Sequence, residues 1–457
     1  MKSFPKAAVA AVLALGVTAV PSAMAKDKKA EAPAAPKLKM SKEAVAAQAA
    51  VVKVFNEVAV PANQAFTAAR ATNDPAQIAT TKAALIAALN TVEPNLVALE
   101  AVAKTPDEQY VATSLRYTKD RALISATHAG DTKAIAAGNN ALAPTLDKLL
   151  ANPSTPAGAA GGYAYDRAWI AYSQRQYPQA ATYFERAQAA GYADPDLRVQ
   201  IARSKMDGGD LAGGLTALDS EIAALKAAGK PVPADYYTLA INRLYTAKSP
   251  DAINWTQKWL RDYPNAKNWH DAIMTFGFAG KNPRAISNQE RLDLCRLLNA
   301  TKGLADESEY LMCADAALKV GVPYETLTVI NAGKASGKIS ASSANAGDLI
   351  DSANRSIKAD SSVATYETRA KASATGELAA QTADAYLGQA NYAKAVELYN
   401  IAKTKGVKDA DALSTRLGIA QAMSGDKASA KANFEAVSPT GSRKDVATLW
   451  LTWLALA

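Results

Sequence analysis

The chain has 457 residues, of which 104 are alanine and only 7% are aromatic. Alanine has the highest helix propensity and the β-branched residues are scattered, so the composition favours an all-α fold and excludes a sheet-rich one. The net charge is +8, but residues 1–39 supply +5 of it, and the remainder carries 44 basic against 41 acidic residues. Such a balanced remainder lacks the basic surface that binds phosphate, so no nucleic-acid partner is expected.

The N-terminus has the three parts of a secretory signal peptide. Lys2 and Lys6 precede an apolar run at 7–20, and the Ala-Met-Ala sequence at 23–25 supplies the small residues of a cleavage site. The run is too short to span a bilayer, and no lipid-anchoring cysteine follows it. We expect residues 1–25 to be removed and the protein to be exported, to the periplasm or beyond, without a stable membrane anchor. A buried N-terminal helix is the alternative.

Three segments precede the most regular part of the chain. Residues 26–40 are rich in Lys, Ala and Pro without apolar periodicity, which predicts a disordered linker. Residues 41–150 are expected to form two helical hairpins, with breaks at Asn73-Asp74-Pro75, Thr105-Pro106-Asp107 and Ala129-Gly130-Asp131. The sequence ANPSTPAGAAGG at 151–162 predicts a flexible hinge.

A pattern of small and aromatic residues then recurs along the chain. In YAYDRAWIAYSQRQYPQAATYFERAQAAG, residues 163–191, a turn at Tyr177-Pro178 separates a first helix from a second that carries Ala180, Phe184 and Ala187. Equivalent positions lie 34 residues apart at Ala180 and Gly214, and 35 residues apart at Ala395 and Ala430. From Gly214 to Ala252 the offset is 38 residues, because the sequence GKPVP at 229–233 lengthens the connection.

These stretches resemble the tetratricopeptide repeat, in which two antiparallel helices cross at small residues and a large aromatic fills the adjacent gap. Five units carry the resemblance, over 165–265 and 376–438, although none has the family's early Trp. The resemblance implies an α-solenoid of tetratricopeptide-like helix pairs at 163–330 and 376–457. A polar helical insertion at 331–375 would separate them, and the last helix, with Trp450, would cap the array. A generic Ala-rich bundle is the alternative.

Patterns typical of catalysis or metal binding are sparse. His128 and His270 are the two histidines, and neither has a second His or a Cys at ligand spacing, so no metal or cofactor is expected. Nucleophile-elbow, phosphate-loop and Ser-x-x-Lys motifs are absent. Asp219 with Glu221, or the acidic residues at 306–309, could pair as acid and base, but such neighbours on a helix usually form a solvated face. We expect a protein that is not an enzyme.

The two cysteines, Cys295 and Cys313, each lie nine residues from Leu304, at the centre of the loop between two predicted helices. In an antiparallel helix pair this symmetry places both cysteines at one level. An exported chain with an even number of cysteines permits a disulfide between them. Two buried free thiols are the alternative.

The expected function is binding of a protein or peptide partner in the bacterial envelope. Tyr165, Trp169 and Tyr172 are spaced four and three residues apart and so share one helix face, which the family resemblance makes concave. Arg203 and Tyr237 occupy the corresponding places in the next two units, and aromatics beside an Arg have the composition of a binding hot spot. Packing of these aromatics in the core is the structural alternative. The rival functions are an architectural subunit of, or an enzyme in, a cell-wall or outer-membrane assembly.

Overall fold

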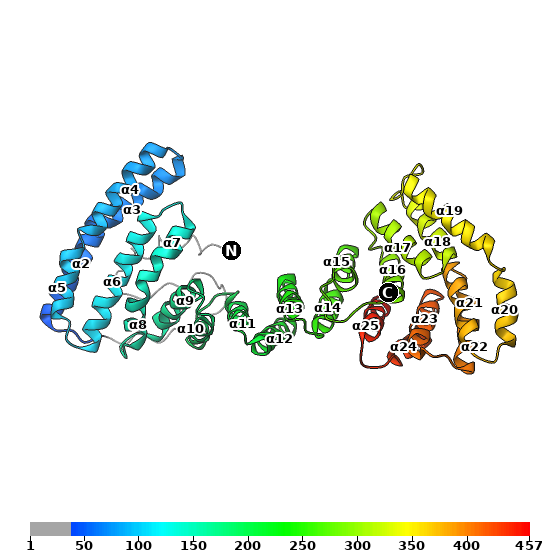
Figure 1. Ribbon diagram of the computed structural model, residues 1–457. Coiled ribbons are helices and arrows are strands. Elements are labelled where there is room, and N and C mark those ends of the chain that lie inside the picture. The colour runs from blue at the N-terminus through cyan, green and yellow to red at the C-terminus, as the bar shows by residue number, and fades with distance from the viewer. Residues whose placement is uncertain (1–37) are drawn as a thin grey trace. The chain divides into compact units, whose positions relative to one another are not determined.

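The computed structural model describes residues 38–457, and every regular element in that range is a helix (Figure 1). The prediction of an all-α fold built from successive helix pairs is confirmed. The predicted signal peptide at 1–25 and most of the linker at 26–40 lie outside the described residues. Contacts divide the chain into two compact units, Met1–Lys230 and Pro231–Ala457.

In the first unit, each helix contacts the next from α8 to α12, while α2 packs on α5 and α3 on α4. The helices of this unit are α2 (Lys42–Val54), the π-helical turn η1 (Phe55–Ala59), α3 (Val60–Thr72), α4 (Pro75–Asn90), α5 (Glu93–Val102), α6 (Pro106–Thr127), α7 (Thr132–Asn139), the 3-10 turn η2 (Asn140–Leu142), α8 (Ala143–Ala151), α9 (Ala157–Ser173), α10 (Tyr177–Ala189), α11 (Leu197–Asp207) and α12 (Leu211–Ala227).

The helix ends in the N-terminal part follow the predicted breaks because each break carries its own capping group. The Asp74 side chain accepts hydrogen bonds from the first two free N–H groups of α4. Thr105 and Glu108 form a reciprocal capping box at the start of α6, and Asp131 caps α7. Side chains that satisfy these otherwise unpaired donors stabilise a helix start by about 1 kcal/mol each.

The helical segments Lys42–Thr72 and Pro75–Val102 are long and apolar enough, by length and composition alone, to cross a membrane. The same properties are common in helices that pack in the core of a globular unit. Here the two segments share a hydrophobic core that includes Val51, Leu89 and Leu99, each fully buried. This core buries 22% of the most apolar stretch of the first segment and 33% of that of the second, so packing within the unit covers only part of their apolar surface.

The predicted hinge at 151–162 is wrong, because this stretch is largely helical and its loop is hydrogen-bonded. Helix α9 begins at Ala157. In the short loop before it, the side-chain amide of Asn152 donates to the Pro106 carbonyl at 2.9 Å. The sequence is rich in Gly and Pro, but Pro156 serves as the N-cap of α9 and the glycines lie inside the helix.

The last residues of the predicted disordered linker are also ordered. Leu38 and Met40 pack against the core of the N-terminal helices. The backbone N–H of Lys39 donates to the Asp107 carboxylate at 2.7 Å. For residues 38–40 the prediction of disorder is therefore wrong, because composition does not reveal contacts that a segment makes with a distant helix.

The small residues of the repeat pattern lie where the two helices of each pair cross. In the α9–α10 pair, Ala168 and Ala180 are fully buried, and Phe184 fills the space beside them with no exposed surface. In the α23–α24 pair, Phe434 is likewise fully buried and lies against Gly418. Because each pair leaves an apolar face for the next pair to cover, the core continues along the helices of a unit.

The second unit also places most helices against their neighbours in the chain. Its helices are α13 (Ala234–Thr246), α14 (Ala252–Asp262), α15 (Ala266–Gly277), α16 (Asn288–Ala300), α17 (Glu307–Lys319), α18 (Pro323–Ala335), α19 (Ala344–Ala359), α20 (Val363–Ala372), α21 (Glu377–Gly388), α22 (Tyr392–Lys405), α23 (Ala410–Met423), α24 (Lys427–Glu435) and α25 (Ser442–Leu456). The segment predicted as a polar insertion at 331–375 contains α19 and α20.

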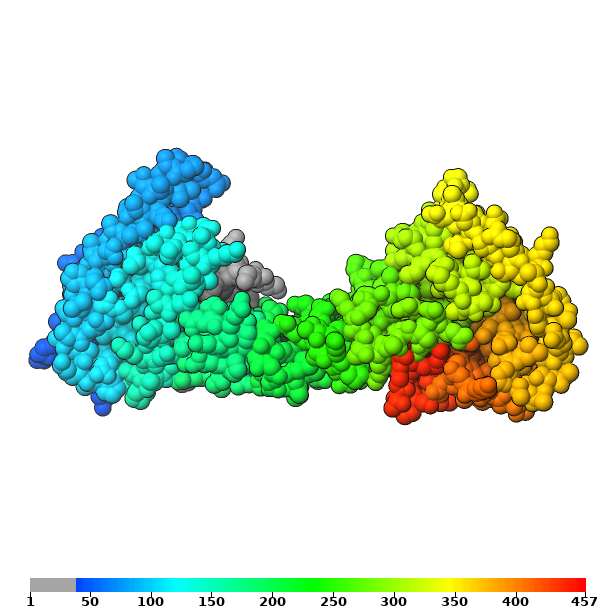
Figure 2. Space-filling model, viewed as in Figure 1, coloured from blue at the N-terminus to red at the C-terminus, as the bar shows by residue number. Residues whose placement is uncertain are grey.

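The last helix, α25, covers α23 and α24, as the red and orange segments of Figure 2 show, and also contacts α14 and α16 (Figure 1). Trp450 is fully buried, stacks on Phe434 with ring centroids 6.0 Å apart, and donates through Nε1 to the Asp293 carbonyl. Arg284 pairs with Asp445 of α25 at 2.5 Å. This helix thus joins the end of the second unit to helices near its beginning.

The helix crossings generate a stability prediction. A Cβ atom on Gly214 would lie 2.4 Å from Met206 Cγ and 2.8 Å from the Ala202 carbonyl oxygen. Overpacking costs about 1–3 kcal/mol and the gain in helix propensity is about 1 kcal/mol. We expect Gly214→Ala to lower the urea midpoint of unfolding.

The matched control is Gly347→Ala, on α19. A Cβ atom at Gly347 would meet no atom within 4 Å, so alanine should add about 0.5–1 kcal/mol to the free energy of unfolding through helix propensity alone. Equal shifts of the urea midpoint in the two variants would contradict close packing at the α11–α12 crossing.

Candidate functional site

The aromatic side chains predicted to share one face of α9 do form a continuous row. The ring centroids of Tyr165 and Trp169 are 6.2 Å apart, and those of Trp169 and Tyr172 are 5.7 Å apart. Tyr177, at the start of α10, extends the row with its ring 5.2 Å from that of Tyr172. These contacts are close to edge-to-face, the geometry that aromatic quadrupoles favour.

Two of the five predicted groove residues belong to the core. Tyr165 is 6% exposed, its ring stacks on that of Tyr192, and its hydroxyl donates to Asp194 at 2.8 Å. Tyr237, on α13 of the second unit, is fully buried and donates its hydroxyl to Asp262. The prediction that these two rings meet a partner is wrong, because each fills the interior of its own helix pair.

The other three residues, Trp169, Tyr172 and Arg203, are half-buried, and we call them the α9–α11 surface. Burial raises the pKa of Tyr172, and its hydrogen bond to Asp207, 2.6 Å long, raises it further. The positive charge of Arg203 lowers the pKa of the same phenol. The Nε atom of Arg203 is buried and has no hydrogen-bond partner within residues 38–457. The surface therefore offers aromatic area beside a half-buried arginine.

His270 and several of the carboxylates considered from the sequence lie in structural contacts, while His128 is the C-cap residue of α6. His270 contacts Asp271 through Nδ1 at 2.9 Å and Glu309 of α17 through Nε2 at 2.6 Å. Asp306 caps α17, and Glu221 pairs with Arg198 at 2.6 Å. In the described part of the chain, no three His, Cys, Asp or Glu side chains are placed to hold a metal ion.

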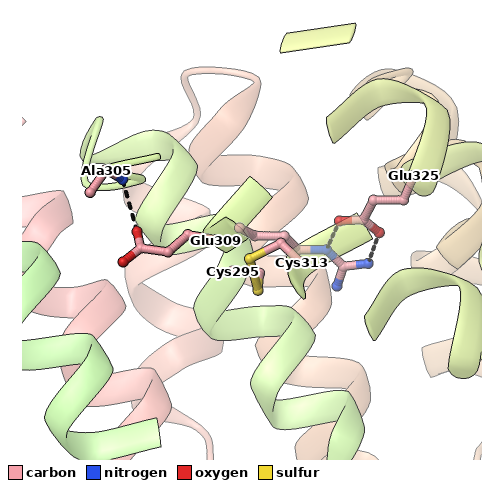
Figure 3. Close-up of a disulfide and its surroundings, with 6 residues drawn as sticks. Cys295, Ala305, Glu309, Cys313 and Glu325 are labelled. Carbon is pink, nitrogen blue, oxygen red and sulfur yellow. Dashed lines mark hydrogen bonds and ion pairs between the residues drawn. A yellow bond between two sulfur atoms is a disulfide. The ribbon is translucent and has the colours of Figure 1, made fainter. Parts of the chain in front are cut away.

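Cys295 on α16 and Cys313 on α17 form a disulfide (Figure 3). Their Cα atoms are 5.6 Å apart, within the usual range for a bridge, and both residues are buried. Figure 3 also shows Glu309 accepting a hydrogen bond from the backbone N–H of Ala305, at 2.8 Å, so the loop between the two helices is held beside the bridge. The pairing expected from the spacing around Leu304 is present.

The second unit contains a cavity of about 350 Å³ that the sequence did not indicate. Its wall comes from α16, the turn before α18, α19 to α21 and α23, and it includes the two nearly buried side chains of Arg296 and Arg416. Gln289 and Arg416, which bond to each other in this wall, are 127 residues apart in the chain. No local motif could have predicted a site assembled from such distant helices.

Comparison with known proteins assigns the chain to no family. No family model matches the sequence, and no curated protein matches it. Among solved structures, the chain is similar to the pentatricopeptide repeat protein PPR10 from maize, with 14% sequence identity and a TM-score of 0.31. The match covers 90% of this chain and 61% of that protein's chain, so this chain spans about three fifths of its length. Such a likeness carries no inference about ligands.

The disulfide gives a direct prediction. Peptide mapping of the non-reduced protein should recover Cys295 and Cys313 in one cross-linked fragment. Because the bridge closes a loop of 18 residues, its reduction should lower the free energy of unfolding by about 3 kcal/mol. Alkylation of two thiols in the native protein without reductant would contradict this pairing.

A pH prediction follows from His270. Burial lowers the pKa of His270, but its hydrogen bonds to Asp271 and Glu309 outweigh burial and leave the pKa above its usual value. The stabilisation from protonated His270 is therefore complete below a pH of about 6.5 and is lost as the pH rises through the raised pKa. The loss of stability caused by His270→Gln should be larger at acidic than at alkaline pH, as measured by urea unfolding.

Glu309→Gln is the matching variant, because it removes one of the two groups that raise the pKa of His270. It should remove much of the same pH dependence. An effect of His270→Gln that is constant across the pH range would exclude a protonated His270 as the stabilising form.

Proposed function

We propose that this chain is a tetratricopeptide-like scaffold that binds a protein or peptide partner in the bacterial envelope and has no catalytic activity. The observation that supports this proposal best is the α9–α11 surface, in which a half-buried Trp169–Tyr172 pair lies beside Arg203. These residues come from the first helices of two successive helix pairs. Tryptophan, tyrosine and arginine are the residue types most enriched at binding hot spots.

The packing of this surface favours binding without large rearrangement. Trp169 contacts Phe184 edge-to-face, at 5.5 Å between ring centroids, so its ring is held before any partner arrives. Binding by an ordered side chain avoids part of the entropy cost of association. Arg203 is half-buried beside the same phenol, so the exposed part of its guanidinium can pair with an acceptor of a partner.

The proposed location rests on two independent features. The sequence at 1–25 has the organisation of a signal peptide. The Cys295–Cys313 disulfide suits an oxidising compartment, where such bridges persist. Together they favour the periplasm or secretion over the cytosol.

The binding proposal predicts the effect of Arg203→Ala. Loss of a hot-spot arginine costs more than about 2 kcal/mol, so capture of a stoichiometric partner from envelope extract should weaken by at least about tenfold. The melting temperature should not fall, because Arg203 forms no ion pair within 38–457 and its buried Nε has no hydrogen-bond acceptor to lose. Trp169→Ala is less informative, since its contacts with Tyr165 and Phe184 predict a lower melting temperature as well.

Arg261→Ala serves as the charge-matched control, because Arg261 is exposed on α14 of the second unit. This variant should capture the partner as the unmodified protein does. If Arg203→Ala leaves capture of the partner unchanged, the α9–α11 surface is not the binding site. Turnover of cell-wall material by the purified protein, without a partner, would favour the enzyme alternative instead.

The location is tested separately. Protein recovered from the periplasm or medium of expressing bacteria should begin at Lys26, as determined by N-terminal sequencing. A mature protein that still begins at Met1 would overturn the proposed export without affecting the binding proposal.

A further inference from the structure

The cavity in the second unit lies outside the α9–α11 surface and is independent of it. Its volume of about 350 Å³ falls within the range of roughly 300–1,000 Å³ found for small-molecule sites. Apolar side chains such as Leu292, Val363 and Leu378 form part of its wall. The polar and aromatic part includes Gln289, Arg296, Tyr324, Gln381, Asp384 and Arg416.

Both arginines of this cavity are neutralised by carboxylates of the protein, while the lining carboxylate of Asp360 accepts from the Tyr366 hydroxyl and the Ser361 N–H and forms no ion pair within 38–457. Arg296 donates to both oxygens of Glu325, at 2.8 and 2.6 Å, and to Asp293 at 2.7 Å. Arg416 pairs with Asp384 at 2.9 Å. Each arginine is thus neutralised by a carboxylate that the protein itself supplies. The lining offers no unpaired arginine with which to select an anionic ligand.

Neither member of the Arg416–Asp384 pair has used all of its hydrogen-bonding capacity. A guanidinium has five N–H groups, and Arg416 donates only to Asp384 and Gln289 among the described residues. A carboxylate can accept about four hydrogen bonds, and Asp384 accepts from Arg416 and from the hydroxyl of Tyr399. A donor and an acceptor with spare capacity therefore stand side by side in the cavity wall.

This pair discriminates among ligand groups. An ammonium group attracted by Asp384 would be repelled by Arg416, and a carboxylate or phosphate would experience the reverse. A hydroxyl group both donates and accepts, so it can satisfy both partners without carrying charge. We propose that this cavity binds a neutral, hydroxyl-rich small molecule of the saccharide class.

Two further residues fit such a ligand. The ring of Tyr324 presents apolar area of the kind that packs against the C–H face of a sugar, and its hydroxyl has no hydrogen-bond partner within 38–457. The side-chain amide of Gln381 also lacks a partner in the described range, and an amide both donates and accepts. Both groups can bond to ligand hydroxyls at no cost to existing contacts.

The site is held in place before ligand arrives. Arg296 follows Cys295 directly on α16, so the disulfide and the Arg296–Glu325 pair hold the same turn of helix; Figure 3 draws the bridge and Glu325 with its hydrogen bonds. The side chain of Arg296 is 9% exposed. Groups fixed by buried ion pairs lose little entropy when they bind a ligand.

The test is titration of the full chain with defined compounds by calorimetry and saturation-transfer NMR. The neutral probes are glucose, maltose, N-acetylglucosamine and N,N′-diacetylchitobiose. The charged probes are glucosamine and glucose 6-phosphate, and N-acetylglutamine methylamide represents an amide ligand. We expect at least one neutral saccharide to bind with a Kd of about 1 mM or lower, and its charged counterparts to bind about tenfold more weakly.

Two variants assign binding to this cavity. Tyr324→Phe and Gln381→Ala should each weaken saccharide binding by about threefold to tenfold, the effect of one net hydrogen bond, while the melting temperature stays within the scatter of the unmodified protein. Gln188→Ala, at an exposed position on α10 of the first unit, is the matched control and should have no effect. The two variants alter different helices, so a folding defect in one leaves the other informative.

Three results would overturn the proposal. They are no binding of any neutral saccharide at about 10 mM, saccharide binding that neither variant weakens, and tighter binding of the charged or amide probes. The last result would mean that the Arg416–Asp384 pair does not select hydroxyl groups.

Discussion

The close approach of two helices at small side chains is the contact on which the repeat-like helix pairs of the described chain depend, as in α9–α10, α11–α12 and α23–α24. At the α23–α24 crossing, atoms of the Phe434 ring lie only 2.8–3.0 Å from the place where Gly418 would carry a Cβ. Ala180 and Ala187 have the same role beside Phe184. An alanine content near one quarter thus has a geometric reason in addition to helix propensity. Larger residues at the crossings would separate the helices and leave the aromatic without a cavity that fits it.

A row of helix pairs still leaves an apolar face at its end, and the second unit covers that face with α25. The position of this helix is fixed by the fully buried carboxylate of Asp293, which pairs with Arg296 at 2.7 Å and with Arg443, at the start of α25, at 2.9 Å. Buried ion pairs add little net stability, because desolvation offsets their attraction, but loss of one partner leaves a costly unpaired charge. Such a network therefore determines which helices pack together, and it contributes less to the free energy of unfolding.

The sequence predicted those features that depend on neighbouring residues. The helix break at Asn73-Asp74-Pro75 and the start at Thr105 carry their own caps, and the symmetry of Cys295 and Cys313 about Leu304 follows from a single hairpin. Features that depend on distant contacts were not predicted. The four-and-three spacing placed Tyr165, Trp169 and Tyr172 on one face, but it could not show that Tyr192 covers Tyr165 and leaves the other two half-buried.

The two candidate sites differ in the same way, because one depends on neighbouring helices and the other on helices that are distant in the chain. The α9–α11 surface comes from helices that follow each other in the chain, so its residues could be identified from the repeat. The cavity depends on Arg416 meeting both Asp384 and Gln289, and that contact exists only when α16, α21 and α23 are assembled. A ligand that bonds to this arrangement binds the folded unit and not the unfolded chain. By linkage its occupancy must add to the stability of the second unit, whereas a partner on the α9–α11 surface would stabilise the first.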